Sequence, residues 1–462
     1  MAHLPRRRKE FCLMSTTITR KPAHNSRWSN WSGVTTGQPR KQVAPRDEAE
    51  LIQLIQRAAA SGERIKPIGA GHSFTSVAAT DGIQVSLDNL AGLIHFDPQK
   101  MTARLRAGTR LRDVPGILAP LGVALANQGD VDPQSLAGAI GTSTHGTGLG
   151  FTGFAGMLRA FRIITPDGHA HECYAGAEGI AGELYDIARV SLGAYGIITE
   201  VELDVVDTFV LHAVERAEPN AQVVDNFAER VRGEDHLEFY WFPGTDVAHV
   251  KTNTRLPGNT PTNPVPRWKE VFDDELLNNG AYRAMCDLAH FFPRLSKPFA
   301  KLSAKTLAQR EYSNVAHDVF VSSRRVRFNE MEYSVPLADA REVLREVQHT
   351  MNTCGEQVLF PIEVRATAAD DVPLSTAKGR ESCYIAIHRY NKDSHQALFR
   401  HIEPIFKSVA TGRPHWGKLH TLTHEDLLAR HEDLARACEV RAKVDPQGMM
   451  RNAMVDRVFG LA

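Results

Sequence analysis

A short glycine-rich turn constrains this chain more than any other feature. Ile65 and Ile68 bracket an apolar run that is typical of a strand, and Gly69-Ala-Gly-His72-Ser73 follows it directly. Glycine at 69 and 71 lets the backbone turn tightly and approach a bound molecule closely. His72 stands at the tip of this turn, where a buried core histidine is not expected. The pattern therefore predicts a ligand site where a strand ends.

A second glycine-rich stretch runs from Ser135 to Gly148 and has the sequence Ser-Leu-Ala-Gly-Ala-Ile-Gly-Thr-Ser-Thr-His-Gly-Thr-Gly. Because glycines this close together disfavour a helix, we predict that the stretch is a loop. Such a loop offers backbone N–H groups to an anion, and its hydroxyls add donors. It matches neither GxGxxG nor GxxxxGK[ST], which argues against those two nucleotide-binding mechanisms. An ordinary surface turn rich in glycine and threonine remains the alternative.

The order of the expected elements indicates an α+β fold with two domains. Short strands and helices alternate as far as Val206, and Asp47 is placed to cap an early helix. Beyond Val206, a hairpin over 237–252 and a strand over 326–335 indicate a second domain built on an antiparallel sheet.

The composition argues against several classes of protein. Lys+Arg and Asp+Glu are both 54 among 462 residues, so no global charge attracts nucleic acid. The six cysteines form no CxxC pair, which argues against a zinc site or a disulfide framework and indicates a reducing compartment. The basic start, residues 1–25, lacks the apolar stretch of a secretory signal. We therefore expect a cytoplasmic protein that is not secreted.

One segment leaves two interpretations open. Residues 288–304 mix phenylalanine and leucine with basic side chains. A segment of this kind can lie on a membrane surface. More often it forms a helical lobe whose basic face is solvated. We therefore expect a helical lobe first, and peripheral contact with a membrane as the alternative.

Candidate chemistry is concentrated in the last quarter of the chain. Glu363 and Arg365 are two residues apart on an expected strand, so both side chains point to the same face. A structural ion pair is the alternative for such a pair. His388 stands at the end of the next expected strand, and Lys418 follows a glycine turn in His415-Trp-Gly-Lys418. On its own, that last motif indicates a surface turn whose lysine extends to solvent.

Taken together, the motifs resemble a known family. From about Trp28 to Asn452 the chain is similar to the vanillyl-alcohol-oxidase-type flavoproteins, and within them to the aldonolactone oxidases and the related alditol oxidases. The aldonolactone oxidases include the D-arabinono-1,4-lactone and L-gulono-1,4-lactone oxidases. The resemblance is carried by Gly69-Ala-Gly-His72-Ser73, Thr144-His-Gly-Thr-Gly148, Phe239-Tyr-Trp-Phe-Pro-Gly-Thr-Asp246, Glu363-Val-Arg365 with Ala368-Ala-Asp-Asp371, and His415-Trp-Gly-Lys418.

The resemblance implies a PCMH-type FAD-binding domain of two lobes and an antiparallel cap domain with flanking helices. It places a basic, disordered tail at 1–27, the FAD-binding domain at 28–206, the substrate-binding cap at 207–425 and a segment that returns to the FAD domain at 426–462. It also implies that FAD is bound covalently through His72, and it implies no metal. The other residues expected to bind the cofactor are Ile68, Gly69, Ala70, Gly71, Ser73, Gly129, Ser135, Gly138, Ala139, Gly141, Thr142, Thr144, His145, Gly146, Gly148, Gly193, Gly196 and Ile198.

The implied reaction is the oxidation of a sugar lactone or a polyol by hydride transfer to the flavin. Glu363, Arg365 and Lys418 match the polar cluster over the flavin ring. His388 favours a lactone, because a threonine is expected there in alditol oxidases. Oxygen, a cytochrome or a quinone can be the electron acceptor. A flavin-fold protein that has lost catalysis and only binds a partner is the alternative from another class.

Overall fold

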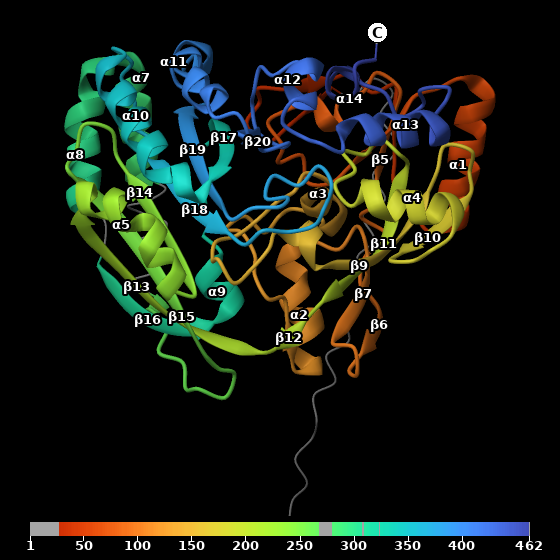
Figure 1. The fold of residues 1–462 in the computed structure, drawn as a ribbon, viewed down its shortest axis with the longest axis horizontal. Helices are drawn as coiled ribbons and strands as arrows, with labels where there is room; N and C mark the ends of the chain where they lie inside the picture. The colour runs from red at the N-terminus through yellow and green to blue at the C-terminus, as the bar shows by residue number, and fades with distance from the viewer. Residues whose placement is uncertain (1–26, 268–279, 307–308, 323, 462) are drawn as a thin grey trace, which may run out of the picture.

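The computed structural model describes residues 27–267, 280–306, 309–322 and 324–461. Within them, two lobes lie side by side, with the first half of the chain in one and the middle of the chain in the other (Figure 1). The expected disordered tail lies outside the described residues, except at residue 27. No helix in the described ranges combines the length and the apolar character needed to cross a bilayer.

The first lobe contains two sheets, one parallel with the order β3-β5-β4 and one antiparallel with the order β10-β9-β11-β7-β6. The strands are β3 (Lys41–Val43), β4 (Ile65–Ile68), β5 (Ile83–Ser86), β6 (Leu93–Asp97), β7 (Thr102–Arg106), β9 (Leu158–Ile164), β10 (Ala170–Tyr174) and β11 (Ile197–Asp204). The helices are α1 (Glu48–Ser61), α2 (Val114–Leu118), α3 (Leu136–Gly141) and α4 (Gly179–Ala188). As predicted, Asp47 caps α1, because its side chain accepts the N–H of Glu50.

Two small strand pairs complete this lobe. Strand β8 (Val123–Ala124) pairs with β12 (Val206–Asp207) where the chain leaves for the second lobe. Strands β1 (Trp28–Ser29) and β2 (Thr36–Gly37) form a hairpin at the start of the described chain. This hairpin covers the glycine turn, since the N–H of Trp31 donates to the carbonyl of Gly71 over 2.8 Å.

The second lobe is built on one antiparallel sheet with the order β16-β13-β15-β14-β18-β19-β17-β20. Its strands are β13 (Phe209–Pro219), β14 (His236–Trp241), β15 (Val247–Pro257), β16 (Arg310–Val315), β17 (Phe328–Pro336), β18 (Ile362–Thr367), β19 (Ser382–Tyr390) and β20 (Arg413–Pro414). Its helices are α5 (Asn220–Gly233), α7 (Tyr282–Phe291), α8 (Ser296–Thr306), α9 (Ala316–Phe320), α10 (Ala340–Thr353) and α11 (His395–Ser408). The predictions of an α+β fold and of an antiparallel second domain are confirmed.

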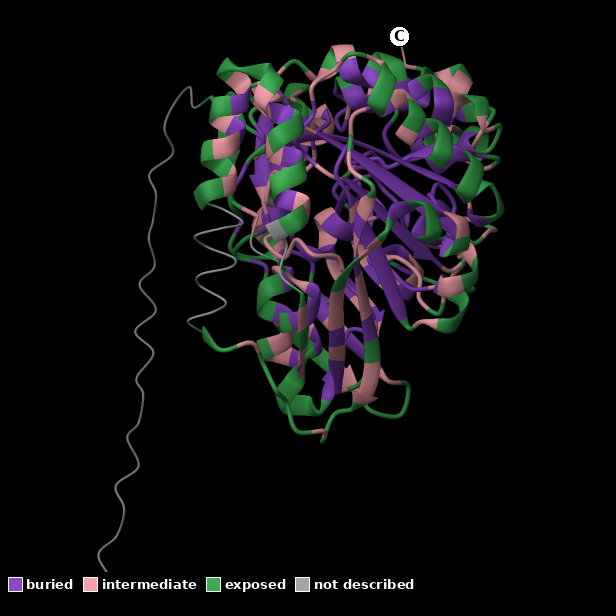
Figure 2. Cartoon of the chain, turned by 90° about the vertical axis from the view of Figure 1, so that its left-hand side faces the viewer, coloured by how far each residue is buried: buried purple, intermediate pink, exposed green. Residues whose placement is uncertain are grey.

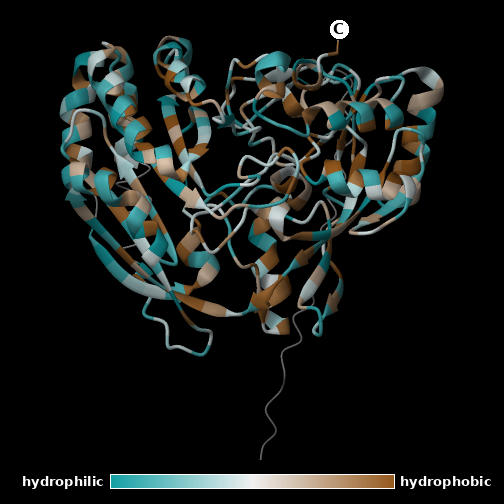
Figure 3. Ribbon diagram, viewed as in Figure 1, coloured by the Kyte–Doolittle hydropathy of each residue, from teal (hydrophilic) through white to brown (hydrophobic). Residues whose placement is uncertain are grey.

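The end of the chain returns to the first lobe. Helices α12 (His424–Leu428), α13 (Leu434–Val444) and α14 (Ala453–Phe459) lie above its sheets in Figure 1, and the Nζ of Lys66 donates to the carbonyl of Met450 over 3.1 Å. Throughout the molecule the strands are mostly buried while the helices expose their outer faces (Figure 2). The helices accordingly carry hydrophilic and hydrophobic sides (Figure 3), as expected for a single layer packed on a sheet.

The prediction that the whole of 135–148 is a loop was wrong for its first half. Leu136–Gly141 forms helix α3, and Ser135 caps it by accepting the N–H of Gly138 over 3.2 Å. The neighbours of Gly141 lie close: a Cβ there would lie 3.1 Å from the Oγ of Ser191, so glycine avoids a tight contact. Tertiary packing therefore overrides the low helix propensity of glycine here.

Candidate active site

A groove open to solvent lies in the first lobe at the glycine turn. It brings together three segments that are far apart in the sequence: the end of β4 with its turn, helix α3, and the connection into β11. The predicted cofactor residues that line it are Ile68, Gly69, Ala70, Gly71, His72, Ser73, Ser135, Gly138, Gly141, Thr142, Gly193, Gly196 and Ile198.

The groove suits a dinucleotide held by backbone. None of the described residues that line it is Lys, Arg, Asp or Glu, so a pyrophosphate here would rest on N–H groups and hydroxyls. Gly71 and Gly193 have φ of +70° and +58°, which favours glycine. A Cβ on Gly69 would collide with the Oγ of Ser135, so the turn and the start of α3 approach each other closely.

His72 lines the groove beside the second lobe. Its ring stacks on Trp31 with centroids 5.6 Å apart, and Trp31 also meets Phe328 of β17 edge-on at 5.2 Å. Burial, with smaller contributions from Lys418 and Arg110, lowers the pKa of His72 to about 4. The imidazole is therefore neutral at pH 7, and one ring nitrogen keeps a free electron pair for a bond to a cofactor.

Six predicted cofactor residues do not line the groove: Gly129, Ala139, Thr144, His145, Gly146 and Gly148. The last of them is joined to the second lobe, since the N–H of Gly148 donates to the carbonyl of Ala366 over 2.7 Å. Next to it, the Oγ1 of Thr147 donates to the carbonyl of Leu237 over 2.6 Å. Gly148 has φ of +124°, and a Cβ there would collide with the carbonyl of Asp235. Glycine at 148 is thus required by contact with the second lobe.

The second sheet arranges the candidate catalytic residues in rows. Directly paired residues share a face, and one row consists of Tyr240, Glu363, Ala386 and Glu332 on β14, β18, β19 and β17. Arg365 belongs to the next row along β18, where it pairs with Tyr384. His388 pairs with Glu330 on the other side of the first row. One sheet face therefore carries Glu363, Arg365 and His388 together.

Arg365 is enclosed by carboxylates. Its Nε donates to Glu238 over 2.8 Å, a terminal nitrogen lies 3.2 Å from Asp130, and the same nitrogen pairs with Glu363. Burial would lower the pKa of Arg365, but Glu363, Asp130 and Glu238 outweigh it and raise the pKa well above its usual range. This guanidinium is a fixed positive charge in a buried site.

Glu363 is the common partner of several groups. The hydroxyl of Tyr240 donates to it over 3.1 Å, and Arg324 lies 3.5 Å from its other oxygen. The Nε2 of His388 lies 3.8 Å away, too far for a hydrogen bond. The alternative interpretation of an ion pair is correct in that Glu363 and Arg365 are paired. The pair, however, belongs to a larger buried cluster at the junction of the lobes.

Lys418 completes this cluster from a loop that is distant in sequence. Its ammonium pairs with Glu330 and lies 5.2 Å from the ring centroid of Phe74, two residues beyond His72. Burial opposes its charged form, yet Glu330 and Glu332 raise the pKa of Lys418 above its ordinary value. The structure thus brings Glu363, Arg365, His388 and Lys418 to one place beside the groove.

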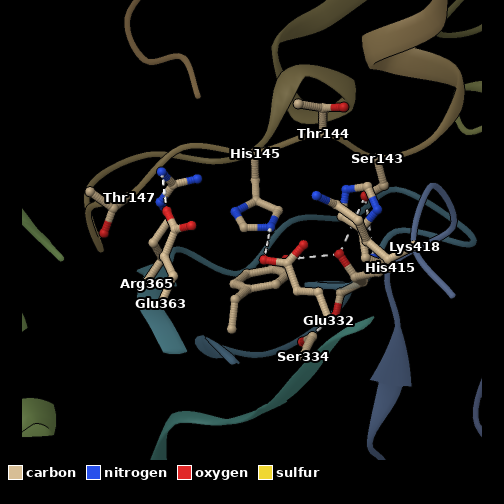
Figure 4. A network of polar contacts seen from close by, with 12 residues as sticks. Ser143, Thr144, His145, Thr147, Glu332, Ser334, Glu363, Arg365, His415 and Lys418 are labelled. Carbon is tan, nitrogen blue, oxygen red and sulfur yellow. Dashed lines mark hydrogen bonds and ion pairs between the residues drawn. The ribbon is translucent and has the colours of Figure 1, made fainter. Parts of the chain in front are cut away.

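Among the described residues, one cluster has the spacing of metal ligands: His145, Glu332 and His415, whose ligand atoms lie within 4.8 Å of one another (Figure 4). The Nδ1 of His415 accepts the N–H of Gly417 over 3.0 Å, so in the neutral ring Nε2 carries the proton. A metal at Nε2 would need an imidazolate, and Lys418 nearby disfavours a cation further. The cluster is better suited to hydrogen bonding, and the Nε2 of His145 lies 3.4 Å from Glu332.

Several residues of the site around the groove and the catalytic cluster were not predicted from the sequence. They are Trp31, Asp130, Glu238, Tyr240, Arg324, Glu330, Glu332 and Tyr384. A signal existed for Glu330 and Glu332, because two carboxylates at spacing two within an expected strand point to one face. Asp130 and Arg324 stand outside the strands and gave no such signal.

Comparison with known proteins agrees with this arrangement. The D-arabinono-1,4-lactone oxidase family model matches residues 201–458, and a FAD-binding domain model matches residues 39–174. The L-gulono-1,4-lactone dehydrogenase of Mycobacterium tuberculosis is 37% identical over 433 residues, covering 94% of this chain and 99% of its own length. The alditol oxidase of a Streptomyces species is 28% identical, covering 96% and 99%.

Two further comparisons concern an animal relative and the fold. The L-gulonolactone oxidase of Bos taurus is 28% identical, covering 94% of this chain and 98% of its own length. The crystal structure of cholesterol oxidase from B. sterolicum superposes with a TM-score of 0.79 at 15% identity, covering 99% and 100% of the two chains, and shows the fold. The chain binds FAD as an oxidoreductase and belongs to the D-arabinono-1,4-lactone oxidase family.

Proposed function

We propose that this protein oxidises a sugar-1,4-lactone, such as arabinono-, gulono- or galactono-lactone, at a carbon that bears a hydroxyl. The observation that carries the proposal is the meeting of Glu363, Arg365, His388 and Lys418 beside the groove that His72 lines. FAD, when bound, supplies the acceptor for the hydride. A cluster of this composition can hold a polar substrate and take its hydroxyl proton.

Each residue has a role that follows from its surroundings. Arg365 stays charged and binds substrate oxygens, and with Lys418 it favours the negative charge that develops during reduction. Glu363 accepts a hydrogen bond from the substrate hydroxyl and takes its proton. His388 donates from Nδ1 to the carbonyl of Pro361 over 2.9 Å, which leaves the electron pair of Nε2 on the side of Glu363.

The substrate class is supported by the relatives and by His388. Relatives named for lactones match along almost the whole chain, and an alditol oxidase also matches. The test is the anaerobic bleaching of the purified holoenzyme by L-gulono-1,4-lactone compared with xylitol. Faster bleaching by the lactone is expected. Bleaching by xylitol alone would establish the alditol alternative, and bleaching by neither would favour a flavin-fold protein without catalysis.

We also propose that FAD is covalently attached to His72. The supporting observations are the neutral ring and its place in the groove lining. Flavin fluorescence should survive denaturing gel electrophoresis in the wild type, whereas His72→Ala should release all its flavin on acid precipitation. His169→Ala is the control, because that side chain is 75% exposed in a distant turn. Retention of the link in His72→Ala would contradict the assignment.

We propose that oxygen, a cytochrome or a quinone accepts the electrons from the reduced flavin. Relatives are named both oxidase and dehydrogenase, which supports both classes of acceptor. Reoxidation of the lactone-reduced holoenzyme by air-saturated buffer and by cytochrome c or a soluble quinone separates them. An oxidase is reoxidised fastest by oxygen, and a dehydrogenase by one of the other acceptors.

For localisation we propose the cytoplasm, with peripheral contact to an anionic membrane surface through α7 and α8. The described cysteines are all free, which fits a reducing compartment. Phe291 and Phe292 are 72% and 61% exposed, and Arg294, Lys297 and Lys301 beside them are exposed too. The double variant Phe291→Ser with Phe292→Ser should sediment less with phosphatidylglycerol vesicles, while phosphatidylcholine vesicles should bind neither protein. Equal sedimentation of wild type and variant would contradict the contact.

A further inference from the structure

Strand β17 brings two buried carboxylates, Glu330 and Glu332, onto the sheet face that carries Glu363. They are 4% and 5% exposed and stand two residues apart, opposite His388 and Ala386 of β19. Burying a carboxylate costs free energy unless a cation or hydrogen-bond donors compensate. The partners of each carboxylate therefore indicate what it does.

The two carboxylates have different partners. Glu332 faces the histidine of the loop that leads from α3, with the Nε2 of His145 at 3.4 Å. Glu330 lies within the candidate catalytic cluster. One of its oxygens pairs with the ammonium of Lys418, and the other lies 3.7 Å from the Nε2 of His388, too far for a hydrogen bond.

We infer that Glu330 is a positioning residue that holds Lys418 in register with Glu363. It touches neither Glu363 nor Arg365 in the described contacts, so it acts through its partner. Lys418 comes from a loop, and its ammonium pairs with this carboxylate of β17. This inference rests on the proposed function.

Loss of Glu330 should also change the pH dependence of the site. The side chain of Lys418 is 22% exposed, and its partial burial favours the neutral amine. The charged and titratable groups that face it are Glu330 and Glu332 of β17, Glu363 of β18, Asp130, His415 and, in the groove, His72. Of these, Glu330 is the one in direct contact with the ammonium. Without this charge, Lys418 should lose its proton at a lower pH.

The test compares Glu330→Gln with Glu403→Gln in the holoenzyme. Glu403 is a matched control, since it is 4% exposed and accepts hydrogen bonds from Tyr333 and Thr421 rather than from a cation. Two quantities are measured from pH 6 to pH 10. One is the anaerobic rate of flavin reduction by L-gulono-1,4-lactone, and the other is the reduction potential of the bound flavin without substrate.

In the wild type no alkaline limb from Lys418 is expected in this range, because its pKa lies above the ordinary value of 10.5. In Glu330→Gln an alkaline limb of the rate should move into the range, since loss of a close opposite charge lowers a pKa by about one to three units. A break in the slope of potential against pH should appear at the same pH. Glu403→Gln should show neither. A loss of rate in Glu330→Gln that is uniform across the range and leaves the slope of the potential unbroken, or a new limb in Glu403→Gln, would overturn the inference.

A second variant keeps the test decisive where Glu330→Gln folds poorly. Glu330→Asp keeps the charge but shortens the side chain, so its rate should fall without an alkaline limb between pH 6 and pH 10. An alkaline limb in Glu330→Asp like that of Glu330→Gln would also overturn the inference. Because the potential is measured without substrate, failure of the lactone to reduce the wild type contradicts the proposed function and leaves the potential as an independent test.

Discussion

The two halves of the site are built by different means. The groove in the first lobe is lined by glycine, hydroxyl and apolar residues, and Lys, Arg, Asp and Glu are absent from its described lining. The cluster on the second sheet is made of ionised side chains, among them Arg365, Glu363, Glu330 and Lys418. The first half recognises a ligand through backbone shape. The second acts on a ligand through charge.

This contrast determines where each half is vulnerable. Backbone donors do not change with most substitutions, so the groove should be sensitive mainly to an added Cβ. Buried charges depend on one another, so removing one of them leaves the others uncompensated. Substitutions in the cluster should therefore act on rate and pH dependence, and substitutions in the groove on flavin retention and stability.

The largest effect is expected from Arg365→Leu. This change removes the fixed cation and leaves Glu238, Asp130 and Glu363 without their shared partner. Anaerobic flavin reduction, measured by stopped-flow absorbance, should slow by about 10³-fold or more, as on removing a group that stabilises charge in the transition state. Arg341→Leu is the control, because that side chain is 56% exposed on the surface of α10. A wild-type rate in Arg365→Leu would contradict the role.

The second largest effect is expected from Gly148→Ala, at the contact between the two lobes. The positive φ and the collision with Asp235 should lower the free energy of unfolding by about 2–4 kcal/mol. Urea unfolding measures it. Gly150→Ala is the matched control, because a Cβ there meets nothing within 4 Å. Equal stability of the two variants would show that the lobes are not in close contact at Gly148.

A buried cation in the first lobe should respond to pH. Burial lowers the pKa of Lys66 to about 7. When protonated, its Nζ donates to the carbonyls of Leu192, Gly193 and Met450, and the neutral amine can keep two of these hydrogen bonds. Between pH 7 and its ordinary value of 10.5, the unfolded chain keeps a proton that the folded protein has lost. The free energy of unfolding should therefore rise with pH there, by up to about 1.4 kcal/mol per unit.

Urea unfolding at pH 7, 8 and 9 tests this dependence. Lys66→Met should lose the rise, because no proton can be released at this position. Lys100→Met, whose side chain is 74% exposed in the wild type, should retain it. Identical slopes in the wild type and Lys66→Met would contradict the assignment of the rise to Lys66.

The smallest effect on stability is expected from Gly71→Ala. Its φ of +70° is strained for alanine, but the nearest atom to the added Cβ, on Trp28, is 3.6 Å away. The flavin-free protein should lose about 1 kcal/mol, whereas flavin content should fall clearly if the cofactor packs on this backbone. Gly33→Ala carries the same strain outside the groove and should keep its flavin. Full flavin content in Gly71→Ala would argue against close approach at the turn.

Much of the fold was predictable because its signals are local. The cap of α1 by Asp47, the hairpin of β14 with β15 and the antiparallel second sheet all follow from residue spacing. Helix α3 was not predictable from propensity, since the packing at Gly141, against Ser191, comes from another part of the chain.

The candidate site was predictable only where a motif marked it. Glu363 and Arg365 are marked by their spacing of two residues on a strand. Asp130 and Trp31 carry no local pattern, and their contacts with Arg365 and His72 arise from the tertiary fold. Glu330 and Glu332 of β17 carry the same signal, since they too are two residues apart on a strand.

Glu363→Gln tests most directly whether the first lobe holds the cofactor while the second acts on the substrate. Flavin content and the anaerobic rate of flavin reduction by L-gulono-1,4-lactone are measured on the same preparation. The cofactor should be retained in full, while the rate falls by about 10²-fold or more, because the group that takes the substrate proton is lost. Loss of flavin, or a wild-type rate, would contradict the claim that the second lobe performs the chemistry on a cofactor held by the first.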